Sequence, residues 1–209
     1  MNILITGASG SVAHYLIDHI GRVEPSAHIV RISRTDAKPI SERTHYTWKW
    51  DLVHGGTIAH LVQYVFADCS FDIVFHLASM AEVGPSFADP GKYLRNNIES
   101  TVNLYEAMRL CKSKAVCVLA STSEVYGNVD RQPLVEDQEL LLPCPVDQRW
   151  HYTIAKIYDE ALVLSRGGIV VRPFNTVGAR QNRHYGAVLP AFVEACINSQ
   201  PMKLVDGGF

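Results

Sequence analysis

The sequence has few features that would place the protein in a membrane, on nucleic acid or around a metal ion. Its 19 Lys and Arg nearly balance 21 Asp and Glu, for a net charge of −2, so no surface for nucleic acid or anionic lipid is expected. No apolar run approaches the roughly 18 residues that span a bilayer. The five cysteines form no Cys-x-x-Cys pair and no ligand-spaced cluster with the nine histidines. We therefore expect no metal site, and reduced thiols in a cytoplasmic protein.

The residues that are present indicate an alternation of strands and helices. The chain has 209 residues and is 47% hydrophobic, enough for a sizeable core in one domain with a small appendage. Short apolar runs, typical of strands buried on both faces, alternate with stretches of helical periodicity. Strands are expected at 3–5, 28–32, 45–50, 72–77, 116–120 and 169–172, and helices at 11–21, 57–66, 91–111, 152–165 and 189–198. This order predicts an α/β fold with a doubly wound parallel sheet.

A glycine-rich turn follows the first expected strand. Residues 7–13 read Gly-Ala-Ser-Gly-Ser-Val-Ala. Gly7 permits a tight turn, Gly10 lets the backbone approach a pyrophosphate, and Ala13 is small enough for close packing of helix on strand. The helix that starts there offers N–H groups and a positive dipole end to phosphates. The turn predicts a dinucleotide site with contacts from Gly7, Ser9, Gly10, Ser11 and Val12.

The end of the second strand bears on the choice between NAD and NADP. An NAD-specific fold carries an acidic residue here for the ribose 2′-hydroxyl, whereas this chain has Ser33 followed by Arg34, which could pair with a 2′-phosphate. The alternative is that Arg34 is a surface turn residue and Asp36 binds the ribose of NAD. The sequence favours NADP slightly.

Tyr152 and Lys156 stand four residues apart in an expected helix, so their side chains share one face. An ammonium beside a phenol stabilises the tyrosinate and lowers the phenol pKa from about 10 toward the range of a working base. The alternative is an ordinary solvated pair on a helix surface. Lys156 is expected to lower the pKa of Tyr152.

Four segments in this order, 1–13, 121–127, 152–156 and 172–175, resemble the extended short-chain dehydrogenase/reductase family, the NAD-dependent epimerases and dehydratases of nucleotide sugars. The resemblance runs from Asn2 to Gly208. It implies a dinucleotide-binding Rossmann domain at 1–175 and the beginning of a C-terminal substrate lobe at 176–209, shorter than in the family. It also implies a homodimer formed through the helices at 91–111 and 152–165.

The resemblance assigns catalytic roles to four residues. Tyr152 would take the proton of the sugar C4 hydroxyl while a hydride leaves that carbon, and Lys156 would also bind the nicotinamide ribose. Thr122 would bridge the sugar hydroxyl to Tyr152, or it only satisfies nearby backbone. Glu124 would shuttle a proton in a later step at C5, as in 4,6-dehydratases and uronate decarboxylases. If Glu124 merely orders its loop, a plain 4-epimerase is the better interpretation.

Further site residues follow from the same resemblance. Residues 145–152 and 204–208 resemble UDP-glucuronate decarboxylases, which favours a UDP-sugar as the substrate. His76 is expected to be a packed histidine and not a catalytic one. The remaining alternative is a dinucleotide-binding module without turnover. The implied cofactor contacts are Asp51, Leu52, Leu77, Ala78, Ser79, Asn97, Tyr152, Lys156 and Pro173, and the implied substrate contacts are Ser79, Thr122, Ser123 and Asn175.

Overall fold

The computed structural model describes residues 1–35, 44–67, 70–81, 83–130, 132–142, 144, 150–181 and 188–202. Asp36, the NAD alternative to Arg34, lies outside the described residues, as do 145–149 and 203–209, which contribute to the resemblance to UDP-glucuronate decarboxylases. No helix of the described part is long and apolar enough to cross a membrane.

Six parallel strands form one sheet in the order β3-β2-β1-β4-β5-β6. They are β1 Asn2–Thr6, β2 His28–Ser33, β3 Thr44–Lys49, β4 Ile73–His76, β5 Val116–Ala120 and β6 Ile169–Val171. The strand order reverses between β1 and β4, and such a reversal leaves a crevice at the carboxyl ends of the strands. The predicted doubly wound parallel sheet is confirmed, and each expected strand is present with ends displaced by at most one residue.

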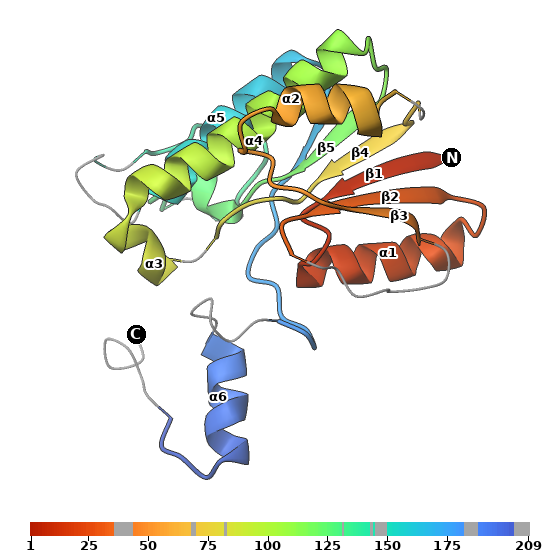
Figure 1. The fold of residues 1–209 in the computed structure, drawn as a ribbon. Helices are drawn as coiled ribbons and strands as arrows, with labels where there is room; N and C mark the ends of the chain where they lie inside the picture. The colour runs from red at the N-terminus through yellow and green to blue at the C-terminus, as the bar shows by residue number, and fades with distance from the viewer. Residues whose placement is uncertain are drawn as a thin grey trace.

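Helices cover both faces of the sheet (Figure 1). They are α1 Ser11–Val23, α2 Thr57–His60, α3 Val83–Ala88, α4 Pro90–Leu110, α5 His151–Ser165 and α6 Val188–Ile197. Figure 1 shows α1 on one face and α2, α4 and α5 on the other. The segment 57–66 is helical as expected, but it is not one continuous α-helix. The single α-helical turn α2 is followed by the π-helical turn Leu61–Val65.

Alternating side chains of β1 divide the core into two layers. Ile3 and Ile5 pack against Ile17 of α1 on one face. Leu4 lies between them in the chain and joins Leu104 of α4 on the other face. Because strand side chains alternate, a continuous apolar run fills both layers. Full burial of each such side chain contributes about 1.5–3 kcal/mol.

The α5 helix turns polar groups toward the sheet and apolar groups outward. Tyr158 and Leu164 are 46% and 55% exposed. A surface helix usually has the opposite arrangement, so the inner face of α5 serves something other than apolar packing. Its buried residues are Thr153, Ala155, Lys156, Asp159, Glu160 and Val163.

The expected helix near 189–198 is present as α6. None of its side chains is buried, and it lies apart from the sheet in Figure 1. Its apolar residues Val188, Leu189, Val193 and Ile197 are all largely exposed. The described residues after β6 therefore add no core of their own.

The turn at Gly7 generates a prediction about stability. Gly7 has a φ of +66°, and a Cβ added there would lie 2.7 Å from backbone atoms of Leu77 and Ala78. Gly56 has a φ of +89° with nothing within 4 Å of an added Cβ. Gly56→Ala should therefore lower the free energy of unfolding by about 1–2 kcal/mol for the left-handed backbone alone. Gly7→Ala should lower it by clearly more, because backbone must also move. Urea unfolding of the two variants measures the difference, and equal losses would contradict the close approach.

Candidate active site and dinucleotide cavity

A cavity of about 220 Å³ opens beside α4, where β1, β2 and β4 end. This is the crevice that the reversal of strand order predicts. It brings together residues that are far apart in the sequence, from the glycine turn to the segment after β4. Ten of the predicted cofactor contacts line it, namely Gly7, Ser9, Gly10, Ser33, Arg34, Asp51, Leu52, Leu77, Ala78 and Ser79.

The glycine turn has the properties of a phosphate site. Gly10 N donates to Gly7 O at 3.0 Å and closes the turn. Gly10 is also the N-cap of α1, and no side chain caps the helix there. The first turn of α1 contains no acidic residue, so nothing opposes an anion at the positive end of the helix dipole. These residues fit the pyrophosphate of a dinucleotide.

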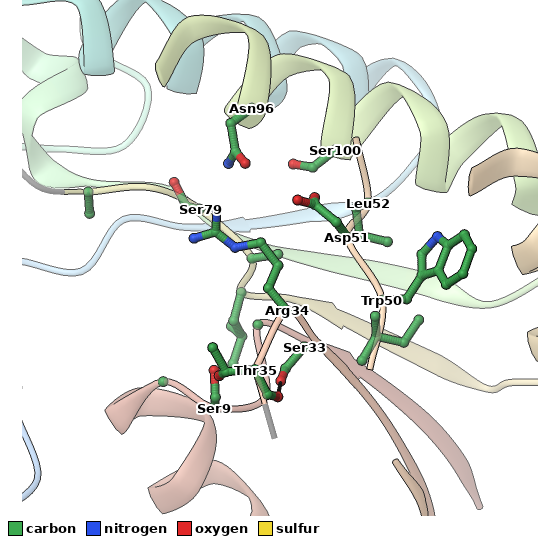
Figure 2. Close-up of a pocket in the computed structure, with 16 residues that line it drawn as sticks. Ser9, Ser33, Arg34, Thr35, Trp50, Asp51, Leu52, Ser79, Asn96 and Ser100 are labelled. Atoms are coloured by element: carbon green, nitrogen blue, oxygen red, sulfur yellow. Dashed lines mark hydrogen bonds between the residues drawn. The ribbon is translucent and has the colours of Figure 1, made fainter. Parts of the chain in front are cut away.

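Arg34 reaches into the cavity from the end of β2. Figure 2 shows its guanidinium pointing toward Ser79 and Asn96. Asp51 lies in the same view below α4. Its neighbour Ser33 instead donates its hydroxyl to the carbonyl of Thr35, which holds the turn after β2. Arg34 is thus the cationic side chain among the cavity-lining residues that the structure describes.

Contrary to the expectation from the sequence, Asn97 does not line the cavity. It is buried, its Oδ1 accepts from Met80 N at 2.7 Å, and its Nδ2 donates to Met80 O at 3.0 Å. Asn96 and Ser100 line the cavity in its place. Neighbouring helical residues point about 100° apart, because a turn takes 3.6 residues, so a shift of one residue decides which asparagine faces the cavity. The lining residues that sequence reasoning missed are Ile32, Thr35, Trp50, Ala81, Asn96 and Ser100.

Some other predicted cofactor contacts also lie outside the cavity lining. Ser11 and Val12 begin α1, and the side chain of Val12 is largely exposed. Pro173 follows β6, and its carbonyl accepts from Ser123 N at 3.0 Å. Pro173, a predicted cofactor contact, is therefore hydrogen-bonded to Ser123, a predicted substrate contact. Asn175, two residues later, is exposed.

Tyr152 stands on α5 beside Thr153, which contacts Glu124. Burial raises the pKa of Tyr152, the hydroxyl of Ser79 lowers it, and the charge of Glu124 raises it. Glu124 Oε2 also accepts from Thr153 Oγ1 at 3.4 Å. This contact brings α5 and the segment after β5 together, so that Glu124 lies next to the residue that follows Tyr152.

The expectation that Lys156 lowers the pKa of Tyr152 is wrong for the protein without a bound cofactor or substrate. Burial raises the pKa of Tyr152 to about 12, and the Ser79 hydroxyl offsets only part of this. Lys156 Nζ lies 6.0 Å from the centre of the Tyr152 ring. It donates to the carbonyl of Ala120 at 2.9 Å and lies 3.8 Å from Asp159 Oδ2. The ammonium is therefore held at the end of β5, and the spacing on the helix could not reveal these competing acceptors.

Thr122 caps the short 3₁₀ helix η2, Ser123–Tyr126. Its Oγ1 accepts from Glu124 N at 3.2 Å. This is the backbone role that the sequence left open for Thr122, and the same bond fixes the direction in which Glu124 leaves the backbone. Thr122 is half-buried, so its side chain is also accessible from outside.

An ion pair that the sequence did not suggest supports this region. Arg172 Nε and Nη2 donate to Glu160 at 3.0 and 2.8 Å. Ser121 donates to the same carboxylate, and the Arg172 guanidinium lies 4.9 Å from the centre of the Tyr126 ring. Bidentate pairs of this kind are geometrically specific. The pair therefore ties α5 to the ends of β5 and β6, next to Thr122.

His76 is a packed residue, as expected. It is 1% exposed, and its two ring nitrogens lie 2.7 Å from Thr6 Oγ1 and 3.1 Å from Thr101 Oγ1. Burial, and then the charge of Lys156, lower its pKa to about 3. The imidazole is therefore neutral at neutral pH. Among the described residues, no group of three or more His, Cys, Asp or Glu could hold a metal ion.

The strand order, the uncapped helix after a glycine turn and the cavity at the switch point define a dinucleotide-binding Rossmann fold. The particular group follows from comparison with known proteins. The model of the NAD dependent epimerase/dehydratase family matches residues 3–208, and the chain belongs to this family.

Relatives and solved structures agree with this assignment. The chain is 28% identical over 221 residues to a trifunctional UDP-glucose 4,6-dehydratase/UDP-4-keto-6-deoxy-D-glucose 3,5-epimerase/UDP-4-keto-L-rhamnose-reductase of Arabidopsis thaliana, covering 99% of this chain and 32% of that protein. It is 32% identical over 143 residues to a UDP-N-acetyl-alpha-D-glucosaminuronate decarboxylase of Bacillus cytotoxicus, covering 66% and 44%. The fold matches that of a UDP-glucose 4-epimerase from Bifidobacterium longum in complex with NAD⁺ and UDP, with a TM-score of 0.73, 22% identity, and coverage of 86% and 55%. The chain thus spans a third to about half of these proteins.

Proposed function

We propose that the protein is an NAD(P)-dependent enzyme that oxidises a nucleotide sugar at C4 and then acts at C5 by dehydration or decarboxylation. The observation that carries the proposal is the grouping around Tyr152 on α5. The next residue, Thr153, donates to the Glu124 carboxylate at 3.4 Å, and Lys156 Nζ lies 6.0 Å from the centre of the Tyr152 ring. When bound, the nicotinamide would accept the hydride. Tyr152 would take the hydroxyl proton in its ionised form, which is a minor species at neutral pH in the protein without ligands, with Lys156 and Thr122 in support. The names of the relatives, which act on UDP-sugars, favour a UDP-sugar as substrate.

Glu124 distinguishes this function from its nearest alternative. A ketone at C4 makes the C5 proton acidic and turns a C5 carboxylate into a β-keto acid, so a nearby carboxylate can transfer the proton in either case. The contact of Glu124 with Thr153 favours a second candidate, a 4-epimerase in which Glu124 only orders its segment. Because the chain spans a third to about half of its relatives, a dinucleotide-binding module without turnover is the third candidate.

Single-turnover measurements with UDP-glucose and UDP-glucuronate test the mechanism. Tyr152→Phe should slow nicotinamide reduction by roughly 10²–10⁴-fold while cofactor binding stays nearly intact, because only the proton acceptor is lost. Lys156→Ala should impair both. Glu124→Gln should let reduced cofactor and keto-sugar accumulate, since the C5 step stalls. Normal turnover of Glu124→Gln would favour the 4-epimerase, and cofactor binding without any reduction by the wild type would favour the module.

The choice of cofactor depends on Arg34. We propose that NADP binds at least as well as NAD, because Arg34 points into the cavity from the end of β2 (Figure 2). Calorimetric titration of Arg34→Ala should show roughly ten- to a hundredfold weaker NADP binding, the range expected for a lost charge-assisted hydrogen bond. NAD binding should change little. Arg22→Ala, which removes an exposed arginine of α1, is the control. An unchanged ratio of NADP affinity to NAD affinity in Arg34→Ala would mean that other residues determine the choice of cofactor.

A homodimer through α4 and α5 is proposed from the outward face of α5, where Tyr158 and Leu164 are exposed. An apolar face of this kind favours a partner. Leu164→Lys should shift the protein toward monomer in sedimentation velocity at micromolar concentration. Val23→Lys, at an equally exposed position of α1, should not. Sedimentation of the wild type as monomer alone would contradict the dimer.

The domain boundary and the location in the cell also remain proposals. The sheet ends with β6, and the described residues beyond it add only the exposed helix α6. This supports a Rossmann domain over 1–175 and the beginning of a substrate lobe over 176–209. The cytoplasmic location rests on the cysteine pattern of the sequence alone.

A further inference from the structure

Lys156 shares its buried site with a second ionisable residue, Asp159. The residues lie on the inner face of α5, and the side chain of each is 1% exposed, with 3.8 Å between Lys156 Nζ and Asp159 Oδ2. Lys156 Nζ also donates to the carbonyl of Ala120 at 2.9 Å. A buried ammonium is costly unless it is paired and hydrogen-bonded. Asp159 therefore supplies the charge, and β5 the neutral acceptor, that keep Lys156 in place.

The other charged groups nearby are engaged or more distant. Glu160, the next residue of α5, is bound by Arg172 at 2.8 Å. Glu124 of η2 contacts Thr153, and His76 of β4 is neutral. Burial lowers the pKa of Lys156, and Asp159 is the largest of the groups that raise it again. Among the described residues, Asp159 is the ion-pair partner of Lys156.

A chain of buried hydroxyls and one imidazole leads from α4 toward the cavity. Its first member is Thr101, whose hydroxyl donates to the carbonyl of Asn97 at 3.2 Å. Thr101 Oγ1 lies 3.1 Å from His76 Nε2, and His76 Nδ1 lies 2.7 Å from Thr6 Oγ1. Thr6 Oγ1 in turn accepts from the backbone N–H of Ala78 at 3.2 Å, and Ala78 lines the cavity.

The donors in this chain have a consistent direction. Thr6 already accepts from Ala78, so its hydroxyl hydrogen is free to go to His76 Nδ1. His76 then carries its proton on Nε2 and donates to Thr101, a tautomer assigned from these partners. Neutral His76 can bridge the two hydroxyls in this way without adding a charge beside Lys156.

We propose that Asp159 is a positioning residue that keeps the ammonium of Lys156 charged and fixed at the end of β5. The part that concerns hydride transfer rests on the proposed function. Without the Asp159 carboxylate, burial would discharge Lys156 at lower pH, and the site would lose the cation that the proposed function uses.

The direct test is an NMR titration of Lys156 through its ¹³Cε resonance, assigned with Lys156→Arg, which needs no substrate. In Asp159→Asn the proton affinity of Lys156 should fall by about tenfold or more, the effect of losing a close opposite charge. Asp159→Glu should restore most of it. Asp18→Asn removes the same kind of carboxylate from an exposed ion pair with Arg22 and should leave Lys156 unchanged.

An unchanged titration in Asp159→Asn overturns the proposal. If Asp159→Asn does not fold, as its circular dichroism would show, Asp159→Ser takes its place, because it also removes the charge beside Lys156. An unchanged Lys156 titration in that variant overturns the proposal instead. Where nucleotide-sugar oxidation is measurable, Asp159→Asn should lose its rate progressively as pH rises, whereas a purely structural role would lower the rate equally at every pH. A shifted Lys156 titration in a protein that reduces no cofactor with any nucleotide sugar would leave this inference standing and reject the proposed function.

Discussion

The hydrogen bond from Lys156 Nζ to the carbonyl of Ala120 constrains much of the site. It places a cation in a fully buried position at the end of β5, where it must be paired. The inner face of α5 consequently carries Asp159 and Glu160, and the second of these requires Arg172 at the end of β6. Most of the buried positions of α5 are therefore polar, while its apolar residues Tyr158 and Leu164 are exposed.

The close contact of the Gly7 turn with Leu77 and Ala78 is a second constraint. It leaves no room for a Cβ at residue 7, and it joins the end of β1 to the segment that follows β4. Because that segment continues to Ser79, one short piece of backbone both closes on the glycine turn and lines the dinucleotide cavity.

The acidity of Tyr152 shows how burial and charge compete in this fold. Burial and the nearby carboxylates raise its pKa, while Lys156 is held by Ala120 and Asp159. The protein by itself therefore keeps the phenol protonated. A Tyr-x-x-x-Lys spacing brings the two residues to one helix face, but the acceptors around the lysine decide where its charge acts.

The sequence by itself determined the strands, the glycine turn and the parallel, doubly wound class of the sheet, and its resemblance to a known family indicated most of the residues at the cavity. The strands and the turn follow from local patterns, because a buried strand requires a continuous apolar run, and a tight turn requires glycine. Only the tertiary structure decided that Asn96 and not Asn97 faces the cavity, that Arg172 pairs with Glu160, and that Asp159 lies beside Lys156. The sequence left these undecided because the rotation of a helix about its axis, and the ion pairs between separate elements, are fixed by packing on the sheet. That packing depends on residues far apart in the chain.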